Sequence, residues 1–202
     1  MSVTTRLTAR DGTLLLIDIQ ERLLPHIDGH AELVQNACLL LDAAQALELP
    51  VLATEQYPRG LGPTVAPIAQ RVPHRAEKSS FSCCGVPELL EQLHGRSVRH
   101  VTLAGIEAHV CVAQTALDLL AQGFVVQVAA DAVGSRHPID WQFALRRLER
   151  AGAVVSTCEA ILFEWTESSD HPAFKTISRL VKQRTATTGS PPSSPLPPSP
   201  PR

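Results

Sequence analysis

The chain has 202 residues, 44% of them hydrophobic, which is enough for one well-buried domain or two small ones. Its 18 basic and 20 acidic residues give a formal net charge of −2, so we expect no nucleic-acid partner. No apolar run approaches the length of a membrane span and the first twelve residues contain no signal-peptide core, so we expect no membrane association.

The cysteines point to a reducing compartment. There are five, an odd number, and only Cys83 and Cys84 are adjacent. Disulfide geometry disfavours a bridge between neighbouring residues. Disulfides are also rare in cytosolic proteins. The sequence therefore predicts free thiols in a cytoplasmic protein.

Apolar segments alternate with helical patterns along most of the chain. Strands are predicted, in chain order, over Thr13–Asp18, Val51–Thr54, Arg75–Glu77, Val101–Ala104, Val125–Ala130 and Val154–Ser156. Helices are predicted over Ala31–Leu47, Pro87–Leu93, Ala108–Gln122, Trp141–Ala151 and His171–Lys182, with a short helix around Ile161–Trp165. The strand before Lys78 has the weakest pattern of the six.

The pattern of the strands indicates the fold class. The runs TLLLID, HVTLAG and FVVQVAAD are apolar without alternation, which is typical of parallel strands covered on both faces. Strands that alternate with helices favour βαβ units. We therefore predict an α/β fold with three layers, α-β-α, around a central parallel, Rossmann-like sheet of about six strands.

The composition also divides the chain. Residues 1–12 are predicted to be an N-terminal lead, residues 13–182 one folded domain, and residues 183–202 a disordered tail rich in proline and serine. Seven of the last thirteen residues are proline, and Leu196 is their one sizeable apolar residue. Such a segment buries too little surface to offset its ordering entropy.

Three chemically reactive side chains follow predicted strands. Asp18 ends the run LLLID, Lys78 follows the weak third strand, and Cys111 begins a helix six residues after Gly105. Ligands of open parallel sheets bind outside the carboxyl ends of the strands, so these side chains are expected to converge there. The unpaired N–H groups of a helix start favour the thiolate form of a cysteine.

Each of these residues alone has a simpler interpretation. Asp18 fits a helix N-cap or an ion pair, Lys78 a solvated loop charge, and Cys111 a small buried hydrophobic residue. Their shared position after strand ends favours a catalytic site.

The order of these motifs resembles the isochorismatase-like cysteine hydrolases. LLLIDIQ comes first, a lysine follows a short strand, and GIEAHVCV precedes a helix and VVQVAADAVGSR. That superfamily includes nicotinamidases, N-carbamoylsarcosine amidase and isochorismatase. The similarity spans about residues 13–182, so the predicted domain is an isochorismatase-like hydrolase domain. The segments TEQYPRGLGPTV and SSDHPAFKTISRLVK look closest to the isochorismatase domain-containing proteins, including YcaC-like hydrolases.

The resemblance implies a role for each residue of the motif. Cys111 is the implied nucleophile, Asp18 the general base and acid, and Lys78 the third member of the triad. The implied reaction hydrolyses an amide or related C–N bond of a small molecule through a thioester-type intermediate. The implied oxyanion donors are the backbone amides of Glu107 and Cys111, beside a cis Ile106–Glu107 peptide bond. The alternative is an interaction protein that keeps the fold without turnover.

The resemblance departs from nicotinamidase at the end of the second strand. Nicotinamidases carry a DWH-like metal motif there, whereas this chain has TEQYPRG and no pair of histidines with metal-ligand spacing. We therefore expect neither a catalytic metal nor a cofactor. Residues just beyond strand ends are candidates to line the substrate pocket: Gln20, Glu55, Gln56, Tyr57 and Phe81. For Glu55 the alternative is a salt bridge or an N-cap, and for Phe81 it is core packing.

Assembly is the last expectation. The resemblance implies a homo-oligomer. Phe163 and Trp165 either anchor an interface or cover the edge of the sheet within one subunit. Arg136 and Asp131, near the end of the fifth strand, are expected to orient loops or contact a neighbouring subunit.

Overall fold

The computed structural model describes residues 6–96 and 98–187, so most of the predicted tail lies outside the described residues. Its centre is a six-stranded parallel sheet with the order β3-β2-β1-β4-β5-β6. The strands are β1 (Gly12–Ile17), β2 (Val51–Gln56), β3 (Ala76–Lys78), β4 (His100–Ile106), β5 (Val125–Gly134) and β6 (Val154–Ser156). All six predicted strands are present, including the weak third one.

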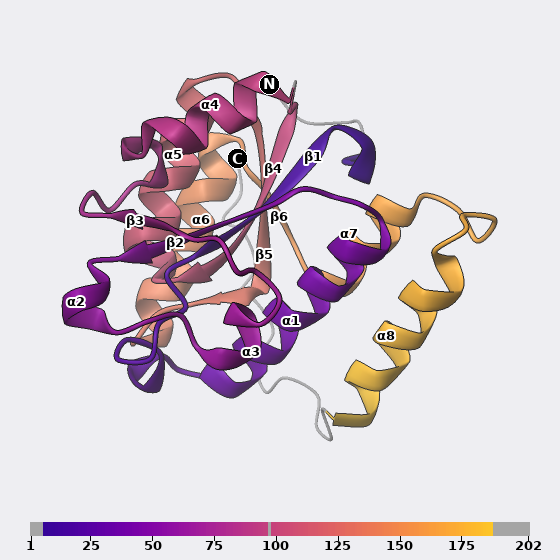
Figure 1. Ribbon diagram of the computed structural model, residues 1–202, viewed down its shortest axis with the longest axis horizontal. Coiled ribbons are helices and arrows are strands. Elements are labelled where there is room, and N and C mark those ends of the chain that lie inside the picture. Colours follow the sequence, from indigo (N-terminus) through magenta and orange to yellow (C-terminus); the bar gives the residue numbers. More distant parts are fainter. Residues whose placement is uncertain (1–5, 97, 188–202) are drawn as a thin grey trace, which may run out of the picture.

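Helices cover both faces of the sheet, which confirms the three-layer prediction (Figure 1). The α-helices are α1 (His30–Ala46), α2 (Pro58–Leu61), α3 (Ala66–Ala69), α4 (Pro87–Gly95), α5 (Ala113–Ala121), α6 (Pro138–Ala151), α7 (Cys158–Thr166) and α8 (Phe174–Thr187). The predicted helix from Ala108 to Gln122 begins instead with a π-helical turn, η4 (Ala108–Val112), which contains Cys111. The described part of the chain contains no helix long and apolar enough to cross a membrane.

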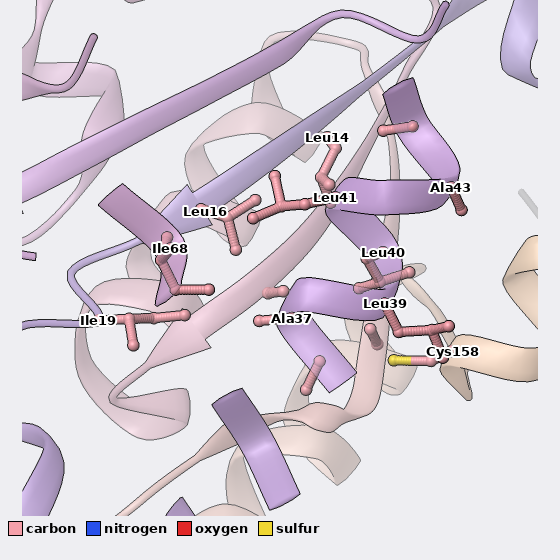
Figure 2. Packing of buried hydrophobic residues seen from close by; sticks show 14 of the residues in the cluster. Leu14, Leu16, Ile19, Ala37, Leu39, Leu40, Leu41, Ala43, Ile68 and Cys158 are labelled. Carbon is pink, nitrogen blue, oxygen red and sulfur yellow. The ribbon is translucent and has the colours of Figure 1, made fainter. Parts of the chain in front are cut away.

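The apolar strands feed two separate cores. Leu14 and Leu16 point to the face covered by α1, α7 and α8, whereas Leu15 and Ile17 point to the face covered by α4, α5 and α6. This alternation explains why the central strand is apolar at every position, because both of its faces are buried. Figure 2 shows Leu14 and Leu16 beside Leu41 of α1, and Leu40 belongs to the same cluster.

Two predictions at the C-terminal end of the fold change with the structure. Trp165 is 1% exposed and belongs to the core, so it covers the sheet within one subunit, whereas Phe163 on the same helix is 43% exposed. The last helix extends to Thr187, five residues beyond its predicted end at Lys182. Arg184 in this extension forms a salt bridge to Asp131 of β5. Asp131 therefore holds helices of its own chain.

Two backbone features position the carboxyl edge of the sheet near β1. Asp18 has a φ of 53°, the left-handed conformation that turns the chain sharply as β1 ends. On the neighbouring strand, Gly105 has a φ of 130°, and a Cβ there would collide with the Ile17 backbone. A side chain is excluded at Gly105, so β4 can approach β1 closely where the site forms.

Candidate active site

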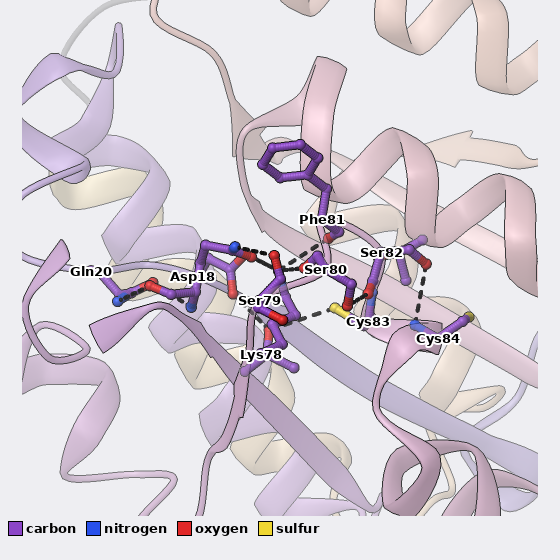
Figure 3. A network of polar contacts seen from close by, with 12 residues as sticks. Asp18, Gln20, Lys78, Ser79, Ser80, Phe81, Ser82, Cys83 and Cys84 are labelled. Atoms are coloured by element: carbon purple, nitrogen blue, oxygen red, sulfur yellow. Dashed lines mark hydrogen bonds and ion pairs between the residues drawn. The ribbon is translucent and has the colours of Figure 1, made fainter. Parts of the chain in front are cut away.

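The carboxyl ends of β1 and β3 bring Asp18 and Lys78 together across a sequence gap of 60 residues (Figure 3). Lys78 Nζ donates to Asp18 Oδ2 over 2.6 Å, and both side chains are fully buried. Charges buried to this degree are costly unless they are paired and hydrogen-bonded. The expected convergence of these two residues is therefore found. The ion-pair alternative for Asp18 is what the structure shows, whereas the N-cap alternative for Asp18 and the solvated-loop alternative for Lys78 do not describe them.

The Lys78 ammonium has further partners on the loops around it. It donates to Gln56 Oε1 over 2.6 Å, to the Phe81 carbonyl over 3.0 Å and to the Ser80 carbonyl over 3.3 Å. Together with Asp18, these acceptors satisfy the three protons of an ammonium group. The Gln56 amide is itself fixed, because its Nε2 donates to the Ser79 carbonyl. Lys78 is thus held in one position by its surroundings.

The Asp18 carboxylate is held at both of its oxygens. Thr54 Oγ1 donates to Oδ1 over 2.8 Å, and Lys78 occupies Oδ2. Burial raises the pKa of Asp18 above its ordinary value, against the charge and hydrogen bond of Lys78 and the hydrogen bonds from Thr54 and Cys111. A carboxyl group with a raised pKa is a stronger base than an ordinary aspartate, which is the direction that proton acceptance from a thiol requires.

Cys111 lies in η4, 7% exposed, and its thiol is within electrostatic reach of the Asp18 carboxylate. Burial and the negative charge of Asp18 raise the pKa of Cys111 to about 12, while the charge of Lys78 lowers it. The sequence-based expectation of a thiolate at the helix start is therefore wrong for the resting site. Desolvation and a neighbouring carboxylate outweigh the partial charges of the helix end.

The turn after β4 has the conformation expected from the resemblance. The Ile106–Glu107 peptide bond is cis. Ile106 is fully buried, and the Glu107 carboxylate accepts hydrogen bonds from the backbone N–H of Arg136 over 3.0 Å and from its Nε over 3.2 Å. Arg136 therefore ties the end of β5 to this turn, as a loop-orienting residue does.

Two predicted pocket residues instead support the loop after β2. Gln20 is fully buried, and its amide bonds the Gln56 backbone and the Gly62 carbonyl. Glu55 Oε1 accepts from the Thr64 backbone and hydroxyl and from Arg75 Nε, which is the salt-bridge alternative for this residue. Burial alone would raise the pKa of Glu55, but the hydrogen bonds from Thr64 and Arg75 lower it below its ordinary value.

The remaining pocket candidates are near Lys78. Tyr57 is 61% exposed, and its backbone N–H donates to the Lys78 carbonyl over 3.0 Å. Phe81 is 53% exposed, so it is not a core residue, and its ring points away from the polar network in Figure 3. Both aromatic side chains are thus attached through their own backbones to the lysine and are free to contact a ligand.

Sequence reasoning missed two buried side chains close to Asp18. Thr54 donates to Asp18, and its Oγ1 lies 3.5 Å from the sulfur of Cys83. Neither residue belongs to a recognisable motif, since a threonine in a strand and a buried cysteine are both common. All five cysteines of the chain are free. Among the described residues, no group of three His, Cys, Asp or Glu side chains is placed to hold a metal ion.

Comparison with known proteins identifies the family. Residues 13–160 match the isochorismatase domain. The chain is 38% identical over 185 residues to isochorismatase domain-containing protein 2A of Mus musculus, which covers 91% of this chain and 89% of that protein. The chain therefore belongs to the isochorismatase domain family, as its motifs indicate.

Solved structures share the fold. The structure of MAR1 ribonuclease from Caenorhabditis elegans has 37% identity and a TM-score of 0.85, over 96% of this chain and 99% of that chain. YcaC from Escherichia coli, an octameric hydrolase of unknown specificity, has 24% identity and a TM-score of 0.82, over 93% of this chain and 98% of that chain. At that identity, the YcaC match shows the fold alone.

Proposed function

We propose that this protein is a metal-independent cysteine hydrolase that cleaves an amide or related C–N bond of a small molecule. The observation that carries this proposal is the buried Lys78–Asp18 pair, whose carboxylate interacts electrostatically with the buried Cys111 thiol. A nucleophile next to a base that a third group orients is the general signature of covalent catalysis. Family membership supports a hydrolase.

The first half of the reaction forms a thioester. Asp18 takes the thiol proton of Cys111, and the sulfur attacks the carbonyl carbon of the substrate. The carbonyl oxygen becomes an oxyanion, for which the backbone N–H groups of Glu107 and Cys111 are the proposed donors. The C–N bond then breaks as Asp18 returns the proton to the leaving nitrogen. An acyl-Cys111 thioester and a free amine result.

The second half restores the enzyme. Asp18, now ionised again, takes a proton from a water molecule, whose oxygen attacks the thioester carbonyl. The C–S bond breaks and the proton passes to the Cys111 sulfur, which releases a carboxylic acid. Lys78 remains a fixed positive charge throughout and stabilises the anionic states of Asp18 and Cys111. No step needs a metal or a cofactor.

Tyr57 and Phe81 are the residues that we propose to meet the substrate. Both are exposed aromatic side chains on the loops that hold Lys78. Aromatic rings favour flat or apolar groups and offer large contact areas. Gln56 supports the site by accepting a hydrogen bond from Lys78. Gln20 and Glu55 support the loop that carries Tyr57.

A substrate panel and one substitution test the proposal. Amides, ureas and carbamoyl compounds are screened with the wild-type protein, and each hit is repeated with Cys111→Ala. We expect complete loss of turnover with an unchanged melting temperature, because a small residue replaces a small one. Cys38→Ala, a half-buried cysteine of α1, is the matched control and keeps full activity. Turnover by Cys111→Ala would refute the nucleophile assignment.

Two other functions are outcomes of the same screen. A protein that turns over no member of the panel would be a non-catalytic interaction protein. The similarity to the MAR1 ribonuclease of Caenorhabditis elegans makes RNA a second substrate to include. Cleavage of an RNA oligonucleotide that persists in Cys111→Ala would assign a ribonuclease site that does not use the thiol.

We also propose a cytoplasmic homo-oligomer. The five free cysteines fit a reducing compartment. The octameric state of the Escherichia coli YcaC hydrolase makes an assembly a reasonable expectation for this fold. Light scattering at micromolar concentration tests it, and a mass equal to that of one chain would reject it.

A further inference from the structure

Thr54 contacts the proposed general base in two ways. Its backbone carbonyl accepts from the Asp18 N–H over 3.2 Å, and its hydroxyl donates to Asp18 Oδ1 over 2.8 Å. Thr54 is 2% exposed, on the strand that pairs with β1, opposite Ile17. One residue thus fixes both the backbone and the carboxylate of Asp18 at the point where the chain turns into a left-handed conformation.

Counting the available protons shows how Thr54 also contacts a second thiol, that of Cys83. A hydroxyl has one proton, and the ionised carboxylate of Asp18 can only accept, so the Thr54 proton goes to Asp18. The sulfur of Cys83, 3.5 Å from Thr54 Oγ1, must then be the donor of that contact. Burial and the charge of Asp18 raise the pKa of Cys83 to about 11, so its proton is present. The Cys83 backbone N–H is anchored on Thr115 Oγ1.

We propose that Thr54 is a positioning residue of this site, and that a hydrogen-bonded chain from the Cys83 thiol through the Thr54 hydroxyl to Asp18 Oδ1 keeps that carboxylate ionised and aimed at Cys111. This inference rests on the proposed function and adds a component to it. Lys78 places a positive charge next to Oδ2 of Asp18, and the hydrogen bond from Thr54 to Oδ1 fixes the orientation of the carboxylate.

The chain has a consequence for pH dependence. The charged or titratable side chains placed against Asp18 are Lys78 from β3, Cys111 from η4 and Cys83 after β3. The Thr54 hydrogen bond favours the ionised carboxylate and lowers the pKa of Asp18. Without the hydroxyl, Asp18 holds its proton to higher pH. In a plot of rate against pH, the rise on the acid side, here called the acidic limb, marks the ionisation of Asp18. For any rate that requires ionised Asp18, this limb then moves to higher pH.

The size of this displacement follows from the bond that is lost. A hydrogen bond to a charged group is worth roughly a ten- to hundredfold change in an equilibrium. The acidic limb should therefore move by about 1 to 2 pH units in Thr54→Val, which keeps the branched shape but not the hydroxyl. Thr54→Ser retains the hydroxyl and should restore the wild-type position.

The experiment measures the rate of iodoacetamide modification of Cys111 against pH, by mass spectrometry on the full chain, which needs no known substrate. Thr102→Val is the control, because Thr102 is a fully buried strand threonine that donates to Gln127 Oε1. It should not displace the limb. If Thr54→Val does not fold, Thr54→Ala replaces it. A limb that stays in place in a folded Thr54 variant lacking the hydroxyl would overturn the proposal.

Two more variants separate this role from a structural one. In an Asp18→Asn background, Thr54→Val should cause no further displacement, because Thr54 acts through Asp18. Cys83→Ala should displace the limb in the same direction by a smaller amount, and Cys83→Ser should restore it. If Cys111 of the wild-type protein is not modified at any pH, the proposed function is contradicted. If wild-type Cys111 is modified and Thr54→Val leaves the acidic limb of its pH profile in place, only this inference is contradicted.

Discussion

Replacing Asp18 by asparagine should lower the pKa of the Cys111 thiol while it abolishes turnover. The substitution keeps the shape of the side chain. The new amide can keep both contacts, since Oδ1 accepts from Lys78 and Nδ2 donates to the Thr54 hydroxyl. What changes is one negative charge in a buried site. The substitution should therefore make the Cys111 thiol easier to ionise and, at the same time, slow hydrolysis.

The magnitude follows from the groups around the sulfur. Burial and the Asp18 charge raise the pKa of Cys111 to about 12, and the Lys78 charge lowers it. A charge at close range changes a pKa by about 1 to 3. Without the Asp18 charge, the alkaline rise of the alkylation profile, where the thiol itself ionises, should move to lower pH by about 1 to 3 pH units. The acidic limb that Asp18 sets should disappear. Loss of the base should lower the hydrolysis rate by roughly 10²- to 10⁴-fold.

The assay is iodoacetamide alkylation of Cys111 across pH, beside turnover of any substrate from the screen. Lys78→Met is the opposite perturbation and should slow alkylation at every fixed pH, because it removes the positive charge. Asp131→Asn is the matched control: Asp131 raises the pKa of Cys158, as Asp18 does for Cys111, at a place away from the triad. It should leave the Cys111 profile in place. An Asp18→Asn profile that stays put or moves to higher pH would refute the reasoning.

Three further predictions concern metal, tail and assembly. EDTA should leave turnover unchanged, because the proposed triad supplies nucleophile, base and charge without a metal. Lost activity that zinc or iron restores would contradict this. Truncation after Thr187 should preserve the melting temperature. Truncation after Lys182 removes the Arg184–Asp131 salt bridge and should lower the melting temperature by about 2–4 °C for each kcal/mol lost. Equal melting temperatures of the two truncated chains would contradict the role of Arg184. Trp165→Ala should lower the free energy of unfolding in denaturant by about 3–5 kcal/mol, because Trp165 is a core residue. Phe163→Glu tests by light scattering whether α7 forms an interface.

The strand ends explain why much of the site could be predicted from the sequence. Apolar runs without alternation predict parallel strands, and parallel strands end at one edge of a sheet. This places Asp18 beside Lys78, although 60 residues separate them. Even the weak strand before Lys78 is real, because its pairing with β2 supplies the hydrogen bonds that its own pattern does not predict.

What could not be predicted depends on contacts between distant segments. Glu55 is a loop support because Thr64 and Arg75 reach it, and no local pattern indicates that. The resting state of Cys111 has the same origin. A helix start favours thiolate, but burial and the charge of Asp18 come from the tertiary fold and have the larger effect. Position along the chain thus predicts which residues meet, and the fold decides their protonation.

A resting thiol has a consequence for how the site chooses what it attacks. Oxidants and simple electrophiles react with thiolates, so the raised pKa of Cys111 works against their attack on the resting site. Asp18 also has a raised pKa, so the two groups hold one proton between them over a wide pH range. Moving that proton to Asp18 creates the thiolate only beside Lys78, where its charge is offset. In the proposed mechanism, a carbonyl compound that fits against the Cys111 sulfur is attacked in that state, whereas molecules that do not fit meet the protonated thiol.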